Sequence, residues 1–142
     1  MSQRNLSRLL DPRSVAVIGA TERAGAPGRL AMESLLSGNF AGGILPVNPK
    51  HRSVMGRDAV GSVGDLATSP DLALIATPPA RARDVFRSLG RAGVPAAVML
   101  AAPAAPQGHG AAMTSDAAIA SVAAEVRAAG VRLLGPGSIG LL

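Results

Sequence analysis

The sequence predicts a single α/β domain with a five-stranded, mostly parallel, doubly wound sheet of the Rossmann-like type and helices on both faces. Five short apolar runs recur along the chain without polar alternation, which is typical of strands buried on both faces. Helical patterns separate these runs, and strict alternation of strand and helix indicates right-handed crossovers onto a parallel sheet. With 142 residues, the chain has the length of one ordinary domain, residues 1–142.

The elements follow one another at near-regular spacing. Strands are expected at 15–18, 44–47, 72–76, 97–100 and 131–134. Helices are expected at 27–38, 79–93 and 115–130, because each segment begins near a proline or serine and ends at a glycine. A short helical turn is expected at 64–68, and the Gly-containing stretch 52–63 and the Ala-, Pro- and Gly-rich stretch 101–114 are expected to be irregular.

The composition excludes several function classes. Hydrophobic residues make up 48% of the chain but aromatic residues only 1%, which argues against a nucleic-acid reader that stacks bases. With no cysteine and two histidines, neither thiolate catalysis nor a metal site is expected. No apolar run approaches the ~18 residues that span a bilayer. We therefore expect a cytoplasmic protein that binds neither nucleic acid nor membrane.

The segment after the first strand, residues 19–28, contains three glycines and leads into a helix. Free N–H groups at a helix N-terminus attract phosphate, and glycines allow close approach of the backbone. The spacing matches neither the dinucleotide fingerprint nor the Gly-rich loop that ends in Gly-Lys-Ser/Thr. A phosphate-binding loop and a simple tight turn both stay open at this point.

The end of the second strand is more informative. NAD-binding domains usually place a carboxylate there to accept hydrogen bonds from the ribose. This chain has Asn48 and Pro49 instead, followed by Lys50, His51 and Arg52. Cations in place of a carboxylate favour a phosphorylated ribose, since a carboxylate would repel it. NADP and coenzyme A both carry such a phosphate, while a solvated turn is the alternative interpretation.

The third strand runs into Thr77-Pro78-Pro79. The two prolines predict a rigid segment at the edge of the sheet where ligands bind in this fold. The chain lacks the residues of two common catalytic arrangements. The chain has no tyrosine and one lysine, and it lacks a Gly-x-Ser-x-Gly nucleophile turn. His109 stands between two glycines, where a solvated loop residue is the simpler interpretation. We therefore expect no catalytic residue in this chain.

Four segments are distinctive: 9–21 (LLDPRSVAVIGAT), 43–50 (GILPVNPK), 70–79 (PDLALIATPP) and 130–136 (GVRLLGP). Taken in order, they resemble the coenzyme A-binding domain of NDP-forming acyl-CoA synthetases. The same domain begins bacterial lysine acetyltransferases of the GNAT type and is distantly similar to part of the succinyl-CoA synthetase alpha subunit. Two departures stand out: Ala101-Ala102-Pro103-Ala104 replaces a Ser/Thr-Ala-Gly-Phe-like turn, and Gly137 replaces an asparagine.

The resemblance implies coenzyme A or an acyl-CoA thioester as the ligand. It places residues 19–23 at the phosphates, 47–50 at the nucleotide end, and 77–79 with 100–101 along the pantetheine arm. It also implies that catalysis belongs to further domains or a partner subunit of an acyl-CoA ligase or acetyltransferase. The expected cofactor-binding residues are Gly19, Ala20, Thr21, Glu22, Arg23, Val47, Asn48, Pro49, Lys50, Ala76, Thr77, Pro78, Pro79, Leu100 and Ala101.

Two other functions stay open from the sequence. One is the NADP-binding domain of an oxidoreductase, which would need a separate catalytic domain. The other is a non-catalytic regulatory or interaction module with a degenerate pocket, which the altered loop at 101–106 and Gly137 favour.

Overall fold

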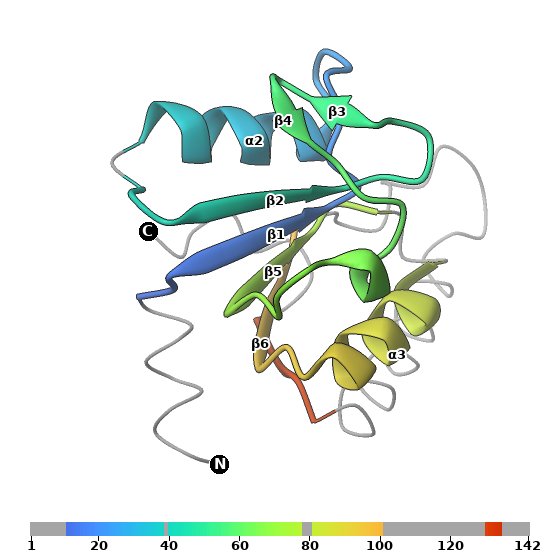
Figure 1. Cartoon of the computed structure of the whole chain (residues 1–142). Helices are drawn as coiled ribbons and strands as arrows, with labels where there is room; N and C mark the ends of the chain where they lie inside the picture. The colour runs from blue at the N-terminus through green and yellow to red at the C-terminus, as the bar shows by residue number, and fades with distance from the viewer. Residues whose placement is uncertain (1–10, 39, 78–80, 101–129, 135–142) are drawn as a thin grey trace, which may run out of the picture.

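The chain folds into a parallel sheet with helices packed against it (Figure 1). The computed structural model describes residues 11–38, 40–77, 81–100 and 130–134. Every neighbouring pair of strands in this sheet is parallel, which confirms the predicted α/β fold with a mostly parallel sheet. In their order across the sheet, the strands are β2 (Gly43–Val47), β1 (Ser14–Ile18), β5 (Leu72–Ile75), β6 (Ala96–Met99) and β7 (Arg132–Leu134).

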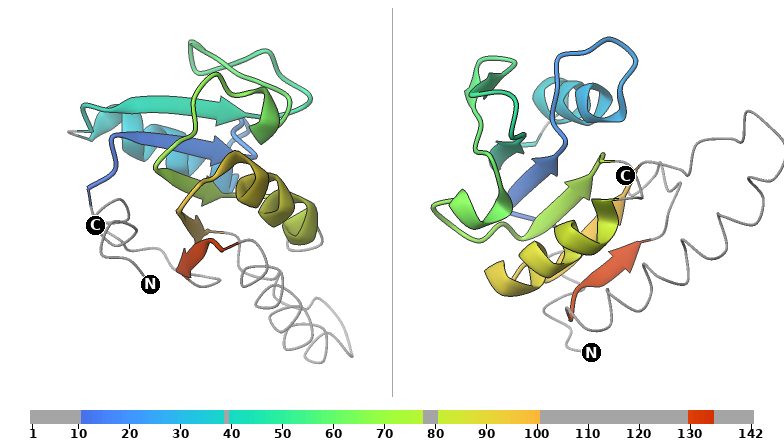
Figure 2. Two further views of the ribbon diagram at one scale, coloured as in Figure 1. Left: turned by 60° about the horizontal axis from the view of Figure 1, so that its bottom comes forward. Right: turned by 90° about the vertical axis from the view of Figure 1, so that its right-hand side faces the viewer.

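Helices α2 (Pro27–Ser37) and α3 (Ala82–Ala92) cover opposite faces of the sheet (Figure 2). Val17 of β1 packs in the buried cluster that contains residues of α2, whereas its neighbour Ile18 packs with Phe86 of α3. Successive side chains of a strand point to opposite faces, and here both faces are apolar. This arrangement explains why the strand segments read as continuous apolar runs.

Both helices end where the sequence provides the signals, and α2 also begins there, whereas α3 begins three residues after the predicted start at Pro79. Proline stands at the first position of α2, where its missing N–H costs nothing. Gly38 ends α2, and its N–H donates to the Ser34 carbonyl at 3.0 Å. Gly93 ends α3 with φ +72°, a conformation that favours glycine. The predicted helix at 115–130 lies outside the described residues, and so the complete doubly wound arrangement stays a prediction.

The stretch 52–63, expected to be irregular, contains a hairpin of β3 (Ser53–Val54) and β4 (Arg57–Asp58), and the prediction was wrong there. Met55 and Gly56 both have positive φ, as in the tight turns that match the twist of paired strands. Strands this short leave almost no periodic signal in the sequence. The 3₁₀ helix η1 (Val63–Asp65) overlaps the turn predicted at 64–68.

The strand order creates an opening at the C-terminal edge of the sheet. The chain leaves β1 for β2 on one side, and then returns to β5 on the other side of β1. The connections that follow β1 and β5 therefore diverge, and ligands of open α/β sheets bind at such a switch point.

Within the described part of the chain, no helix has the length and apolarity needed to cross a membrane.

Candidate ligand-binding site

A pocket of about 920 Å³ lies at this switch point. Its volume is near the upper end of the range for small-molecule sites, which is roughly 300–1,000 Å³. Four segments surround it: the loop after β1, the end of β2, the approach to η1, and the end of β5 with the first turns of α3. The pocket thus gathers segments that are distant in the sequence.

Close backbone packing shapes the floor of the pocket. Gly19 has φ +87°, and its N–H donates to the Val47 carbonyl at 2.9 Å. Gly28, in the first turn of α2, is buried against Gly19, and a Cβ on Gly28 would collide with the Gly19 carbonyl group. The absence of a side chain at Gly28 therefore lets the N-terminus of α2 sit directly beside the end of β1.

Asn48 joins the first loop to the end of β2. Its side-chain Nδ2 donates to the Ala20 carbonyl at 2.8 Å, and its Oδ1 accepts the Lys50 backbone N–H at 2.8 Å. Its own backbone N–H donates to the Val60 carbonyl at 2.8 Å, which brings the segment before η1 to the same edge. Through its side-chain amide and its backbone N–H, this one half-buried residue thus holds three parts of the pocket wall together.

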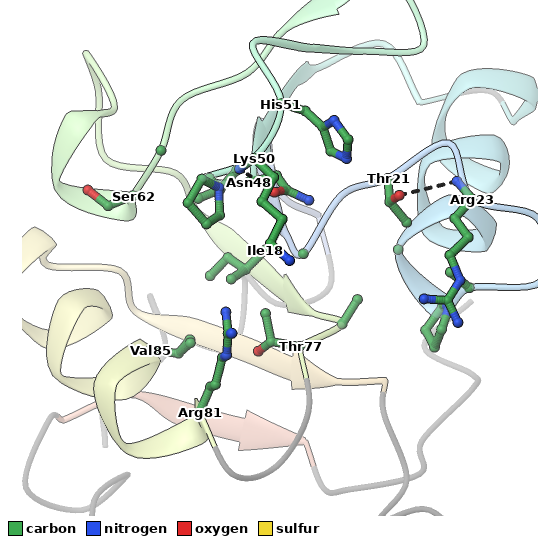
Figure 3. Close-up of a pocket in the computed structure, with 18 of the residues that line it drawn as sticks. Ile18, Thr21, Arg23, Asn48, Lys50, His51, Ser62, Thr77, Arg81 and Val85 are labelled. Carbon is green, nitrogen blue, oxygen red and sulfur yellow. Dashed lines mark hydrogen bonds between the residues drawn. The ribbon is translucent and has the colours of Figure 1, made fainter.

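Three cationic side chains reach the pocket from three elements: Arg23 from the first loop, Lys50 from the turn after β2, and Arg81 from the start of α3 (Figure 3). All three are exposed, and none has a hydrogen-bonding or ionic partner for its side chain among the described residues. Asp84 is the one carboxylate among the described lining residues. The charges of these side chains leave a net attraction for anions.

Arg29, in the first turn of α2 beside the pocket, differs from these three cations because its side chain has partners. Its Nε lies 2.7 Å from Glu33 Oε1, and its Nη1 donates to the Glu22 carbonyl at 2.6 Å. Arg29 therefore has its partners within the protein, whereas the pocket cations keep their donors available.

Thr77 supplies a second kind of unused donor. Its Oγ1 is buried and has no hydrogen-bond partner in the described structure. A buried hydroxyl without a partner costs stability, about 1–3 kcal/mol. Thr77 lines the pocket beside Gly19, where an added Cβ would lie 3.1 Å from the Thr77 Cγ2. A polar group of a ligand would satisfy this hydroxyl.

Most of the predicted binding residues come together at the pocket. Pro78, Pro79 and Ala101 lie outside the described residues. The predicted residues that line the pocket are Gly19, Thr21, Arg23, Val47, Asn48, Pro49, Lys50, Ala76 and Thr77.

Three predicted residues lie elsewhere. Ala20 is fully buried with the cluster under α2 and offers its carbonyl to Asn48. The Glu22 carboxylate turns to the hairpin, where Oε1 accepts the Met55 N–H at 3.0 Å. Leu100 packs partly buried against the core. None of these three residues lines the pocket in this structure.

The sequence reasoning missed Arg81 and the wall formed by Gly61, Ser62 and Val63. Arg81 is one of four arginines in or beside α3, and the helix start that singles it out lies three residues after the predicted one. No group of three or more histidine, cysteine or acidic side chains suited to a metal occurs among the described residues.

Known proteins are similar to this chain both in sequence and in fold. A family model described as the CoA binding domain matches residues 13–142. The chain is 35% identical over 139 residues to the trans-feruloyl-CoA synthase FCS1 of an unknown prokaryotic organism. It is 33% identical over 138 residues to the ADP-forming acetate–CoA ligase I of Archaeoglobus fulgidus. These matches cover 98% and 96% of this chain, which spans only 19% of the length of either curated relative.

A solved structure of a related synthetase has a similar fold. The dinucleotide-forming acetyl-coenzyme A synthetase 1 of Ca. Korarchaeum cryptofilum, in complex with phosphate and ADP, matches with a TM-score of 0.82 and 28% identity. The match covers 97% of this chain and 28% of that one. The comparisons confirm the resemblance found in the sequence and the predicted cofactor, coenzyme A. Since the family model matches nearly the whole of it, the chain belongs to the CoA binding domain family.

Proposed function

We propose that this chain binds coenzyme A or an acyl-CoA in the switch-point pocket, as the nucleotide-binding domain of an NDP-forming acyl-CoA synthetase. The observation that carries the proposal is Lys50, an exposed cation that follows β2 and reaches into the pocket where NAD-binding domains have a carboxylate (Figure 3). A cation at this point favours a ribose that carries a phosphate, as coenzyme A does.

The pocket divides into parts that suit the parts of this ligand. Gly19, Thr21 and Arg23, with the N-terminus of α2, would hold the diphosphate, because N–H groups at a helix start favour anions. Residues 47–50 would hold the phosphorylated ribose. The pantetheine arm would pass Ala76 and Thr77, with Thr77 Oγ1 available for a hydrogen bond. The resemblance adds Pro78, Pro79 and Ala101, which lie outside the described residues, to this path.

The activity of the whole protein is a further part of the proposal. Because the chain spans 19% of the length of the first curated relatives, we place catalysis in other domains or in a partner subunit. The names of these relatives, a feruloyl-CoA synthase and an ADP-forming acetate–CoA ligase, favour an acyl-CoA ligase over a lysine acetyltransferase as the parent. We also propose that residues 115–130 form a third helix that completes a doubly wound, five-stranded domain.

Titration calorimetry with coenzyme A and with dephospho-CoA tests the ligand. We expect tighter binding of coenzyme A, because only this ligand carries the 3′-phosphate. Lys50→Ala should weaken coenzyme A by about tenfold, which corresponds to about 1.4 kcal/mol, at the low end for a charge-assisted hydrogen bond. Arg57→Ala is the matched control, since Arg57 is exposed on β4 and outside the pocket.

Each result separates the parts of the proposal. No heat with either ligand would contradict coenzyme A binding. Equal affinities would contradict the role of the 3′-phosphate, and an unchanged affinity of Lys50→Ala would remove Lys50 from the site. NADP belongs in the same titration, because Lys50 would also suit a 2′-phosphate. Tighter binding of NADP than of coenzyme A would favour the oxidoreductase domain instead.

A further inference from the structure

The start of α3 carries a third cation that the family resemblance did not assign. Arg81 stands at the N-cap of α3, and its side chain makes no capping hydrogen bond. It lines the pocket and has no ionic partner among the described residues. Figure 3 shows Arg81 and Lys50 extending toward the middle of the pocket from opposite walls.

Helix electrostatics make this position unfavourable for an arginine. The N-terminus of a helix carries partial positive charge, which stabilises acidic side chains and disfavours cations. Asp84 in the first turn of α3 follows this rule, and Arg81 opposes it. An exposed cation that opposes the helix dipole and lacks an anionic partner contributes little to the stability of the fold, and so its use is better sought in binding.

We propose that Arg81 is a specificity-determining residue that binds, together with Lys50, the phosphomonoester on the ribose of the ligand. The inference rests on the proposed binding of coenzyme A and identifies a second contact for its 3′-phosphate. A guanidinium presents several N–H donors in a fixed plane that suits phosphate oxygens, while the Lys50 ammonium acts as a point charge. The two cations reach the site from β2 and from α3, on the two sides of the switch point.

The test compares Arg81→Gln, Arg81→Lys and the control Arg57→Gln by titration calorimetry at low and high salt. We expect Arg81→Gln to weaken coenzyme A by about five- to tenfold, the lower part of the range for a charged contact because the side chain is exposed. Its affinity for dephospho-CoA should change by less than about twofold. Arg81→Lys should recover part of the loss, and Arg57→Gln should match the unchanged protein.

Thermal unfolding distinguishes a binding role of Arg81 from a structural one. If Arg81 stabilised the fold, its removal would lower the melting temperature. Removing the charge of Arg81 relieves the conflict with the helix dipole, and so the melting temperature of Arg81→Gln should stay equal or rise while the affinity falls. A melting temperature that falls together with the affinity for both ligands would assign Arg81 to the fold and overturn the inference.

The failure of this inference is distinguishable from failure of the proposed function. If the unchanged protein prefers coenzyme A to dephospho-CoA and Lys50→Ala abolishes that preference, but Arg81→Gln keeps it, Arg81 does not contact the phosphate. If Arg81→Gln weakens both ligands equally, the guanidinium contacts a shared part such as the adenine, and the inference is again wrong. If the unchanged protein binds neither ligand, or binds both equally, the result contradicts the phosphate site proposed at Lys50. It then contradicts this inference as well.

Discussion

The floor and the rim of the pocket differ in what fixes them. The floor consists of Gly19, Gly28, Asn48 and Thr77, which are buried or half-buried and held by backbone contacts and short hydrogen bonds. The rim consists of the exposed cations Arg23, Lys50 and Arg81, whose side chains have no partner among the described residues. Packing therefore sets the shape of the pocket, and we expect the exposed charges to set which ligand it prefers. Substitutions in the floor should lower or raise stability, whereas those in the rim should lower affinity without lowering stability.

The largest expected effect is at Gly28. Alanine has the better helix propensity by about 1 kcal/mol, but its Cβ would collide with the Gly19 carbonyl, which is backbone and has little room to move. We expect Gly28→Ala to lower the free energy of unfolding by about 3 kcal/mol, measured by urea denaturation.

Gly64→Ala is the matched control for this substitution. A Cβ at Gly64 meets only Ser62 Oγ at 3.8 Å, which is an ordinary contact. If Gly28→Ala is as stable as Gly64→Ala, close backbone approach does not fix the floor, and the contrast between floor and rim fails.

Asn48 should show a mixed effect, since it belongs to the floor and orients the rim. Asn48→Ala removes the hydrogen bonds to the Ala20 carbonyl and from the Lys50 N–H, and should destabilise the fold by about 2 kcal/mol. Affinity for coenzyme A should fall as well, because the turn that carries Lys50 loses its anchor. Denaturation and calorimetry on the same protein measure the two effects.

Asn48→Asp sharpens this test. Aspartate keeps an acceptor for the Lys50 N–H but loses the donor to Ala20 and adds a negative charge beside the ligand. Compared with Asn48→Ala, we expect an equal or larger loss of stability, because a carboxylate oxygen would face the Ala20 carbonyl oxygen, and a larger loss of affinity. An affinity no lower than that of Asn48→Ala would show that the amide serves only the fold.

The smallest effect on stability is expected at Thr77, and its sign is informative. Valine has nearly the shape of threonine and removes the buried hydroxyl that lacks a partner. Thr77→Val should therefore raise the free energy of unfolding by up to about 1 kcal/mol and weaken coenzyme A several-fold. Destabilisation by this substitution would mean that the hydroxyl already has a partner in the free protein, and Thr77 would then belong wholly to the floor.

The sequence predicted the central strands well for a physical reason. β1, β2, β5 and β6 lie within one residue of their predicted bounds, because strands covered on both faces must be apolar throughout. Helix ends were predictable where a local signal exists, as at Pro27, Gly38 and Gly93. The β3–β4 hairpin carries no such signal, since its two-residue strands depend on a turn at Met55 and Gly56 with positive φ.

The site was predictable to the extent that it follows strand ends. Thr21, Lys50 and Thr77 come shortly after predicted strands, and parallel strands end at the same edge. Arg81 was not predictable in this way, because its place in the pocket depends on where α3 begins and on which side of the sheet the helix packs.

The amino-acid sequence alone determined the class of fold, the edge of the sheet that holds the site, and the cation that replaces a carboxylate after β2. Hydrophobic pattern and residue charge are local properties, and they are readable before any contact forms. The tertiary structure decided which cations face one pocket, that Gly28 packs on the Gly19 backbone, and that Thr77 keeps an unused hydroxyl. These features depend on contacts between segments distant in the chain, whose geometry exists only once the sheet and both helices have packed.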